Sequence, residues 1–239
     1  MKLMLIGCEY AGTTTLALAV NNWAKKALGR DFGIIHDHWK IPHISGHEPT
    51  EKSQFLTEME QQQILALSPR LKQWIQRHCL SYHTPSVPND RNVMNVGHVF
   101  DDSIYGSLYF GYQYFEYKRP ITHVDRSNFI RHLETQVTKN APETVLVLLR
   151  ASPDVIRRRM KEKPHPGGVL QEKDIESVLD SFQYEFSQTM FEHKFYIDTS
   201  TSTMHETLAE FVDKIEPHLT ESDRSRMGLR QMSICNGTG

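Results

Sequence analysis

Two glycines near the start of the chain, Gly7 and Gly12, constrain its fold more than any other feature. They follow the short apolar run 3–6 and precede apolar residues at helical spacing: Leu16, Val20, Trp23 and Ala27. The order strand, glycine loop, helix matches the phosphate-binding pattern G-x-x-x-x-G-K-[ST]. Backbone N–H groups in such a loop bind an anion, although the same glycines also suit an ordinary turn of an α/β fold. We predict a phosphate site whose residues are Gly7, Ala11, Gly12, Thr13, Thr14 and Thr15.

The loop departs from the pattern at the position of its lysine. Thr13 stands there, so the ammonium that normally reaches the β- and γ-phosphates is missing. Thr14 keeps the hydroxyl that would hold Mg²⁺. The sequence therefore favours phosphate binding more strongly than phosphoryl transfer.

Composition narrows the class of protein. The 239 residues are enough for one α/β domain, and the net charge of −2 gives no reason to expect nucleic-acid or membrane binding. The apolar run 3–6 leads directly into the glycine loop, which indicates a strand and not a signal peptide. The three cysteines have no spacing typical of disulfides or metal sites, which fits a reducing, cytoplasmic compartment: Cys8, Cys79 and Cys235.

Further apolar runs predict the rest of a sheet. Short strands are expected at 32–35 and at the end of 93–100, a buried strand at 144–149, and a last strand at 194–199. Helices are expected within 50–80, with caps at Thr50 and Ser68, then at 125–137, from Ser152, at 175–186, and from the capping box Thr203-x-x-Glu206. From residue 220 onward the polar, glycine-bearing sequence predicts a flexible tail.

Polar side chains follow two of these strands. Ligands bind outside the carboxyl ends of parallel strands, so Asp37, His38 and Trp39 after the second strand suit a substrate pocket. A core tryptophan beside solvated histidines is the alternative, and the histidines at 36, 38, 43 and 47 match no zinc pattern. After the third strand, Asp101 could hold Mg²⁺ opposite Thr14, or could cap the helix that carries Tyr105.

A basic helix end lies between Arg157 and Lys163 and runs into the loop Pro164-His165-Pro166-Gly167-Gly168. Arginine is well shaped for bidentate contact with phosphate, so this segment suits a lid that closes over a nucleotide. The alternative is a solvated basic helix face.

Taken together, the chain resembles the P-loop kinases of the deoxynucleoside kinase and thymidylate kinase group over roughly residues 2–217. Asp101-Asp102-Ser103-Ile104-Tyr105 is similar to that group's Glu-Arg-Ser or Asp-Arg-Tyr motif. Ser152-Pro153-Asp154, with Arg159 and Lys163, is similar to its Ser-Pro-Glu helix and two lid arginines. Asp37 with Trp39 loosely resembles its catalytic carboxylate and tryptophan.

The resemblance implies an α/β, three-layer P-loop NTPase-type fold, with a five-stranded parallel sheet, helices on both faces and a helical lid. One domain would span 1–219, with a substrate-side helical insertion at about 40–92, a lid at about 159–172, and the tail at 220–239. ATP and Mg²⁺ are the implied cofactors, with Thr14 and Asp101 as metal ligands. The catalytic residues would be Asp37, Arg159 and Lys163, and the substrate-binding residues His38, Trp39, Asp102 and Tyr105.

The departures from the group keep other functions open. Thr13 replaces the loop lysine, Asp102 replaces the motif arginine, and Lys163 replaces a lid arginine, although Arg157 or Arg158 could compensate. Beside a kinase, we therefore consider a kinase-fold scaffold without catalysis and a sulfotransferase that uses adenosine 3′-phosphate 5′-phosphosulfate. The predicted partners are a nucleotide and a small acceptor, and not nucleic acid or a membrane; a homodimer is left open.

Overall fold

The fold was analysed in a computed structural model of the chain, which describes residues 1–32, 35–37, 56–89, 91–112, 128–165 and 168–236. Among these residues, no helix is both long enough and apolar enough to cross a membrane.

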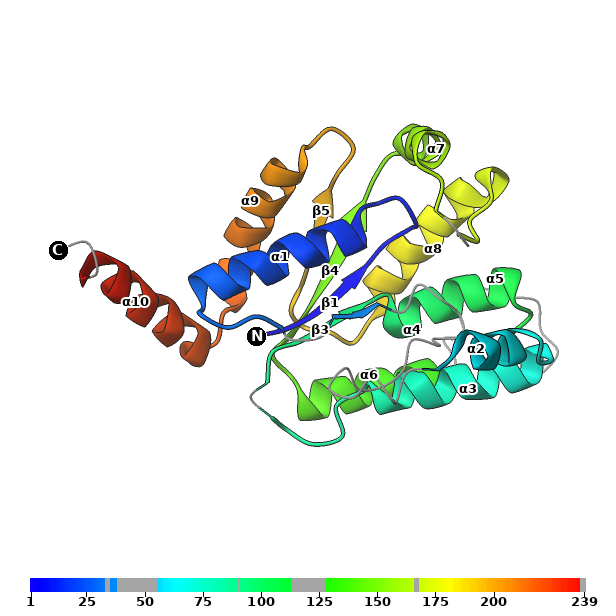
Figure 1. Cartoon of the computed structure of the whole chain (residues 1–239), viewed down its shortest axis with the longest axis horizontal. Helices are drawn as coiled ribbons and strands as arrows, with labels where there is room; N and C mark the ends of the chain where they lie inside the picture. The colour runs from blue at the N-terminus through cyan, green and yellow to red at the C-terminus, as the bar shows by residue number, and fades with distance from the viewer. Residues whose placement is uncertain (33–34, 38–55, 90, 113–127, 166–167, 237–239) are drawn as a thin grey trace.

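A five-stranded parallel sheet forms the centre of the molecule (Figure 1). Its order is β2-β3-β1-β4-β5, with the strands β1 (Lys2–Ile6), β2 (Ile35–Asp37), β3 (Val93–Val96), β4 (Thr144–Arg150) and β5 (Lys194–Asp198). Every residue of β1 is buried, as expected of a central parallel strand covered on both faces. Leu5 pairs with both Val96 and Val147, so the loop that follows β1 lies between the carboxyl ends of β3 and β4.

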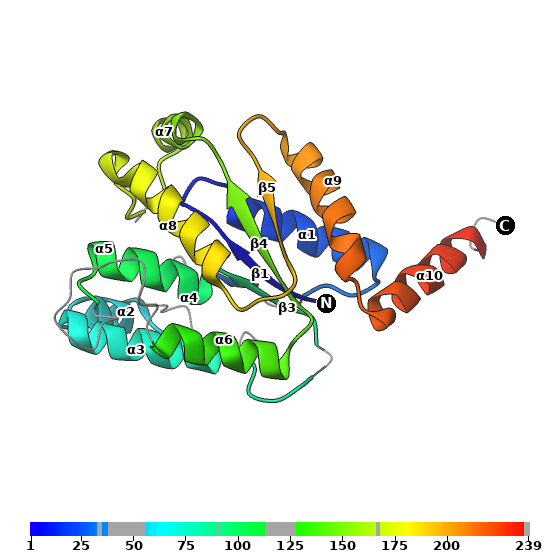
Figure 2. The same ribbon diagram turned by 180° about the vertical axis from the view of Figure 1, so that it is seen from behind.

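Helices cover both faces of the sheet, which gives the predicted three layers. On one face, α1 (Thr13–Ala27) packs against β1 and β3 and against α9 (Met204–Ile215). On the other, α8 (Ile175–Gln188) packs against β4, and it lies in front of the sheet in the view from behind (Figure 2). The remaining helices are α2 (Glu58–Leu65), α3 (Pro69–Tyr82), α4 (His98–Asp101), the π-helix Asp102–Gly106, α5 (Ser107–Tyr109), α6 (Asn128–Asn140), α7 (Pro153–Glu162), α10 (Glu221–Asn236) and short 3₁₀ turns at Glu172–Asp174 and Glu216–His218.

Most predicted helix starts are confirmed. Ser152 caps α7 by accepting a hydrogen bond from Val155 N–H at 3.4 Å, and Thr203 with Glu206 forms the capping box of α9. Ser68 precedes Pro69 at the start of α3, although its side chain makes no capping hydrogen bond. The helix expected to follow Thr50 begins at Glu58, where Thr57 and Glu60 form a capping box that the sequence analysis overlooked. Thr50 itself lies outside the described residues.

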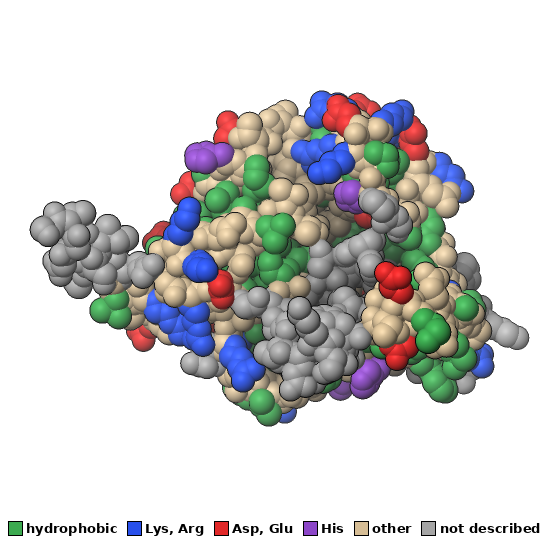
Figure 3. Space-filling model, viewed as in Figure 1, with side chains coloured by type: hydrophobic (Ala, Val, Ile, Leu, Met, Phe, Trp, Pro, Cys, Tyr) green, Lys and Arg blue, Asp and Glu red, His purple; other side chains and the backbone are tan. Residues whose placement is uncertain are grey.

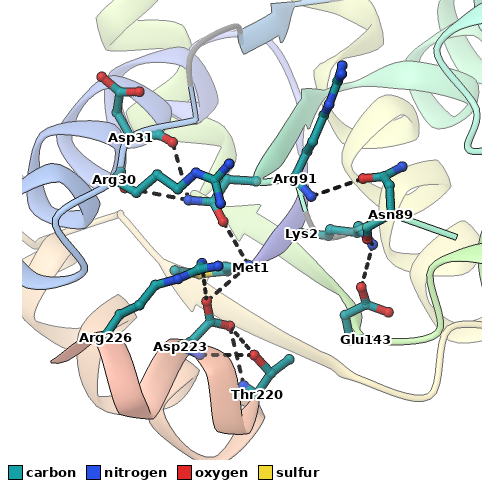
Figure 4. A network of polar contacts seen from close by, with 11 residues as sticks. Met1, Lys2, Arg30, Asp31, Asn89, Arg91, Glu143, Thr220, Asp223 and Arg226 are labelled. Carbon is teal, nitrogen blue, oxygen red and sulfur yellow. Dashed lines mark hydrogen bonds and ion pairs between the residues drawn. The ribbon is translucent and has the colours of Figure 1, made fainter. Parts of the chain in front are cut away.

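Residues Glu221–Asn236 form the helix α10, whereas the sequence predicted a flexible tail from residue 220 onward. Thr220 caps α10 by accepting a hydrogen bond from Asp223 N–H at 3.2 Å. The buried Asp223 carboxylate also accepts a hydrogen bond from the Met1 ammonium at 3.1 Å, and this ammonium donates to Asn92 at 2.9 Å (Figure 4). Asn92 in turn donates to the Asp31 carbonyl at 3.2 Å. This helix is therefore held in place by polar contacts with residues that are distant in the sequence. No local sequence pattern predicts such contacts.

Candidate functional site

The loop between β1 and α1 has the backbone of an anion-binding turn. Gly12, with φ 100°, precedes α1 directly, and Tyr10 is a left-handed non-glycine residue with φ 68°. The Ala11 N–H donates to the Cys8 carbonyl at 2.9 Å and closes a turn inside the loop. Alternation of backbone conformation makes a concave set of N–H groups, and the N-terminus of α1 adds its partial positive charge.

Gly7 allows this loop to lie close to β4. A Cβ at position 7 would be 2.6 Å from the Leu149 carbonyl oxygen, which is closer than real Cβ contacts come. This oxygen belongs to the backbone and cannot rotate away, so only glycine fits at position 7. Packing therefore explains the first glycine of the motif, and the positive φ explains the second.

A hollow of about 820 Å³ opens in front of this loop. Figure 3 shows the face hollowed beneath α7, with charged and histidine side chains gathered at the rim. The hollow is lined by Gly7, Glu9, Tyr10, Gly12, Thr13, Thr14, Thr15, Val96, Asp101, Arg159, Glu162, Lys163 and His165.

The hollow brings together most of the predicted site residues. The loop positions meet the predicted metal ligand Asp101 and the predicted lid cations Arg159 and Lys163, which come from distant parts of the sequence. Ala11 does not line the hollow: it is buried, and its carbonyl accepts a hydrogen bond from the Thr199 hydroxyl at 2.9 Å. Asp102 and Tyr105 lie behind this surface, and Tyr105 accepts a hydrogen bond from Glu9 N–H at 2.9 Å.

Asp101 lies in a helix and not at a strand tip. β3 ends at Val96, Gly97 is the N-cap of α4, and Asp101 is the last residue of that short helix. Asp101 also precedes the π-helix that carries Tyr105, but its side chain makes no capping hydrogen bond there, so the predicted capping role is wrong. Gly97 has φ 78°, and a Cβ there would be 2.4 Å from Asp101 Oδ2, so the carboxyl group occupies the space that a side chain at position 97 would need.

We predict that Gly97→Ala lowers the free energy of unfolding by about 1–3 kcal/mol, because alanine is strained at positive φ and displaces the Asp101 carboxyl group. Urea denaturation of the two proteins measures this difference. Gly228→Ala on α10 is the matched control, since a Cβ there meets nothing within 4 Å. Equal midpoints for Gly97→Ala and the control would contradict the packing described here.

Arg159 is tied to the backbone of the loop. Its guanidinium donates to the Tyr10 carbonyl at 2.9 Å, to the Thr199 hydroxyl at 3.1 Å and to the Thr199 carbonyl at 2.6 Å. Burial, and then the neighbouring Arg158, lower the pKa of Arg159. In this arrangement Arg159 stabilises the left-handed Tyr10 and joins the loop to the end of β5.

The other cations of α7 are mostly paired at the surface. Arg157 forms ion pairs with Asp154 and Glu176, and Arg158 lies 4.0 Å from the Glu162 carboxylate. Within the part of the chain that the structure describes, Lys163 forms no ion pair, and it lines the hollow. Lys163, and not Arg157 or Arg158, is therefore the cation available to replace the missing loop lysine.

A buried polar group lies next to Asp101. Asp102 is fully buried, and neither carboxyl oxygen makes a hydrogen bond of regular geometry among the described residues, although the Gln76 side chain is close enough to lower its pKa. Burial raises the pKa of Asp102 to about 8, against the smaller opposing effects of Gln76 and Arg77. The Tyr112 hydroxyl is likewise buried without a described partner, and burial and Asp102 raise its pKa. Buried groups of this kind are costly and are often found at functional sites.

Some predicted residues cannot be placed. Asp37 ends β2, at the carboxyl edge of the sheet, but only its backbone is described. His38, Trp39 and the histidines at 43 and 47 lie outside the described residues. Among the described residues there is no group of three His, Cys, Asp or Glu side chains that could hold a metal ion.

Three residues with roles at the site were not predicted from the sequence: Glu9, Tyr10 and Thr199. Glu9 and Tyr10 stand at variable positions of the glycine pattern, yet their side chains contact the segment after α7. A carboxylate inside a loop expected to bind an anion was the available signal. Thr199 follows the last strand, and no local pattern indicates that it reaches the Ala11 carbonyl.

No protein-family model and no curated protein sequence matches the chain, so its likeness to known proteins is structural. The YorR protein from Bacillus subtilis, solved in complex with phosphorylated GDP, superposes with a TM-score of 0.53 at 14% identity, covering 92% of this chain and 100% of YorR. The chain has the fold of the P-loop nucleoside and nucleotide kinases.

Two further structures show the same P-loop kinase fold. Deoxyadenosine kinase from M. mycoides with bound dATP has a TM-score of 0.52 at 16% identity, covering 90% of this chain and 99% of that one. Thymidylate kinase from Candida albicans has a TM-score of 0.52 at 10% identity, with coverages of 93% and 92%. The match extends over nearly the whole of each chain.

Proposed function

We propose that this protein binds ATP with Mg²⁺ in the hollow and transfers the terminal phosphoryl group to a nucleoside, a nucleotide or another small hydroxyl acceptor, in the cytoplasm. The observation that carries the proposal is that the glycine loop, Thr14, Asp101 and Lys163 all line one hollow. The backbone amides of the loop would bind the phosphates, and the α1 dipole would add to that attraction.

The residues present fit a magnesium ion. The Thr14 hydroxyl and the Asp101 carboxylate are oxygen donors that line the same hollow, and Mg²⁺ in phosphate sites usually keeps several waters and few protein ligands. When bound, Mg²⁺ supplies positive charge to the phosphate oxygens.

Side chains of the protein would supply the other groups that phosphoryl transfer needs. Lys163 would provide a cation at the phosphates, and Arg159 would keep the loop in shape through the Tyr10 carbonyl. Asp37, at the end of β2, would accept the proton of the acceptor hydroxyl, as the family resemblance implies. Structures of this fold hold dATP and phosphorylated GDP, which supports a nucleoside or nucleotide acceptor.

Calorimetry followed by an activity panel tests this proposal. We expect ATP binding in the presence of Mg²⁺ and none in EDTA, and ADP formation that depends on a nucleoside or nucleoside monophosphate. Binding of adenosine 3′-phosphate 5′-phosphosulfate without ATP binding would favour a sulfotransferase instead. The absence of any nucleotide binding would reject both enzymes.

A nucleotide-binding protein without catalysis is a second candidate. It is favoured by the position of Arg159, whose two terminal nitrogens already bind backbone and Thr199. Mg²⁺-dependent ATP binding with no product from any acceptor in the panel would support this second function.

We predict that Asp101→Asn weakens Mg²⁺-dependent ATP binding about 10-fold, the usual effect of losing a group that holds the metal through its water shell. Calorimetric titration at several Mg²⁺ concentrations measures the change. Asp213→Asn, at an exposed position on α9, is the matched control and should leave binding unchanged. An Asp101→Asn protein with wild-type dependence on Mg²⁺ would remove Asp101 from the metal site.

A further inference from the structure

Glu9 and Tyr10 connect the glycine loop to the segment that follows α7. Glu9 Oε1 accepts hydrogen bonds from Val169 N–H at 3.1 Å and from Leu170 N–H at 3.2 Å. The Tyr10 hydroxyl accepts one from His165 N–H at 3.1 Å, and the two rings stack with centroids 4.2 Å apart. Three backbone N–H groups of one segment thus bind two neighbouring side chains of the loop.

The Glu9 carboxylate binds the segment after α7 and does not leave its charge unneutralised in the loop. A carboxylate in a phosphate-binding loop would repel the ligand, but here one oxygen is neutralised by two N–H groups of another segment. The second oxygen is buried without a hydrogen bond among the described residues, and it lies 4.0 Å from His165 Nδ1. Glu9 thus satisfies backbone groups that would otherwise need water.

Gly168 allows the close approach. A Cβ at position 168 would lie 2.8 Å from Glu9 Oε2 and 3.2 Å from the His165 Cβ. A larger residue would therefore displace the Glu9 carboxylate from the position in which it accepts the hydrogen bonds from Val169 and Leu170. Burial raises the pKa of Glu9, while the Val169 and Leu170 amides lower it, as expected of a carboxylate enclosed between two segments.

A second tyrosine holds the far end of the same segment. The Tyr109 hydroxyl accepts a hydrogen bond from Gln171 N–H at 3.1 Å and donates to Asp174 at 2.9 Å. The segment is therefore attached on both sides of residues 169–170. Lys163, which joins it to α7, lines the hollow in this attached arrangement.

We propose that Glu9 and Tyr10 form a clasp, which holds His165, Val169 and Leu170 against the loop and so positions the Lys163 ammonium at the hollow in place of the absent loop lysine. Glu9 is a positioning residue, because it acts through Lys163 and the lid backbone. The part of this inference that concerns Lys163 rests on the proposed ATP site, whereas the clasp itself does not.

Hydrogen exchange of the ligand-free protein tests the clasp without reference to ATP. Glu9→Ala should speed exchange of the Val169 and Leu170 amides at least 10-fold, and Glu9→Gln, which keeps an acceptor oxygen, should restore most of the protection. Gly168→Ala should act like Glu9→Ala, whereas Gly228→Ala should have no effect. Unchanged exchange in Glu9→Ala and Gly168→Ala would overturn the clasp.

Calorimetry with Mg²⁺ and ATP then tests the positioning of Lys163. We expect Glu9→Ala and Lys163→Ala each to weaken binding about 10-fold, and the double variant to be no worse than either. Additive losses would show that Glu9 acts independently of Lys163 and would overturn the positioning role. Faster exchange in Glu9→Ala, in a protein whose wild type binds no ATP, would retain the clasp and reject the role of Lys163 together with the proposed function.

Discussion

Thr13→Lys is expected to increase the rate of phosphoryl transfer about 100-fold, the usual contribution of one preorganised donor to a charged transition state. Thr13 is the first residue of α1 and lines the hollow, so a lysine there regains the position that reaches the phosphates in the ordinary loop pattern. The rate is measured with ATP and the acceptor identified in the panel. Thr13→Met, with similar length and no charge, should give no gain.

The same variant tests the compensation by Lys163. With a lysine at position 13, Lys163→Ala should reduce activity much less than it does in the wild-type background. The reason is that the introduced lysine and Lys163 would both contact the same phosphates. If Thr13→Lys changes neither ATP affinity nor rate, the hollow is not where the terminal phosphates bind.

Ionisation of Asp102 as the pH rises is expected to have the largest effect on the free energy of unfolding. Its pKa is about 8 in the fold, raised by burial, against about 4 for an unfolded aspartate. Between these values the folded state binds more protons than the unfolded state, so stability falls as pH rises and levels off above pH 8. Below pH 4 both states are protonated and the penalty is absent. From pH 5 to pH 8 we expect a loss of up to about 4 kcal/mol, at 1.36 kcal/mol for each pH unit.

Chemical denaturation of the metal-free protein at pH 5, 6, 7 and 8 measures this loss. Asp102→Asn cannot ionise and should remove the slope, whereas the exposed Asp213→Asn should keep it. A steep slope that survives in Asp102→Asn would assign the effect to other groups. The wild type therefore retains a carboxyl group that destabilises the fold at neutral pH.

The sequence predicted the fold well because its signals are local. The apolar run of β4, the glycines around the loop and the capping residues Ser152 and Thr203 each act within a few residues. The start of α2 and the helix α10 were misjudged. The first has its capping box at Thr57, and the second is fixed by Asp223 reaching Met1 across the fold.

The site was predicted less completely for the same reason. The loop glycines follow from backbone geometry, so their positions could be inferred from spacing alone. The contacts of Arg159 with the loop and of Glu9 with Val169 and Leu170 join residues about 150 positions apart. No pattern within one segment encodes such pairs. The hydrogen bond from Arg159 to the Tyr10 carbonyl is one of these pairs.

The π-helix at Asp102–Gly106 has a consequence for how relatives of this chain can vary in length. A π-turn holds one residue more than the α-helical turn it replaces. Here it separates Asp101, at the hollow, from Tyr109, which binds Gln171. Loss of one codon within the π-turn would restore regular winding and leave Tyr109 on the same side of the helix, whereas loss of one codon from a regular helical turn would rotate Tyr109 by about 100° away from its partner. Single-residue gaps should therefore be tolerated within residues 102–106 and selected against in the regular helical turns beside them.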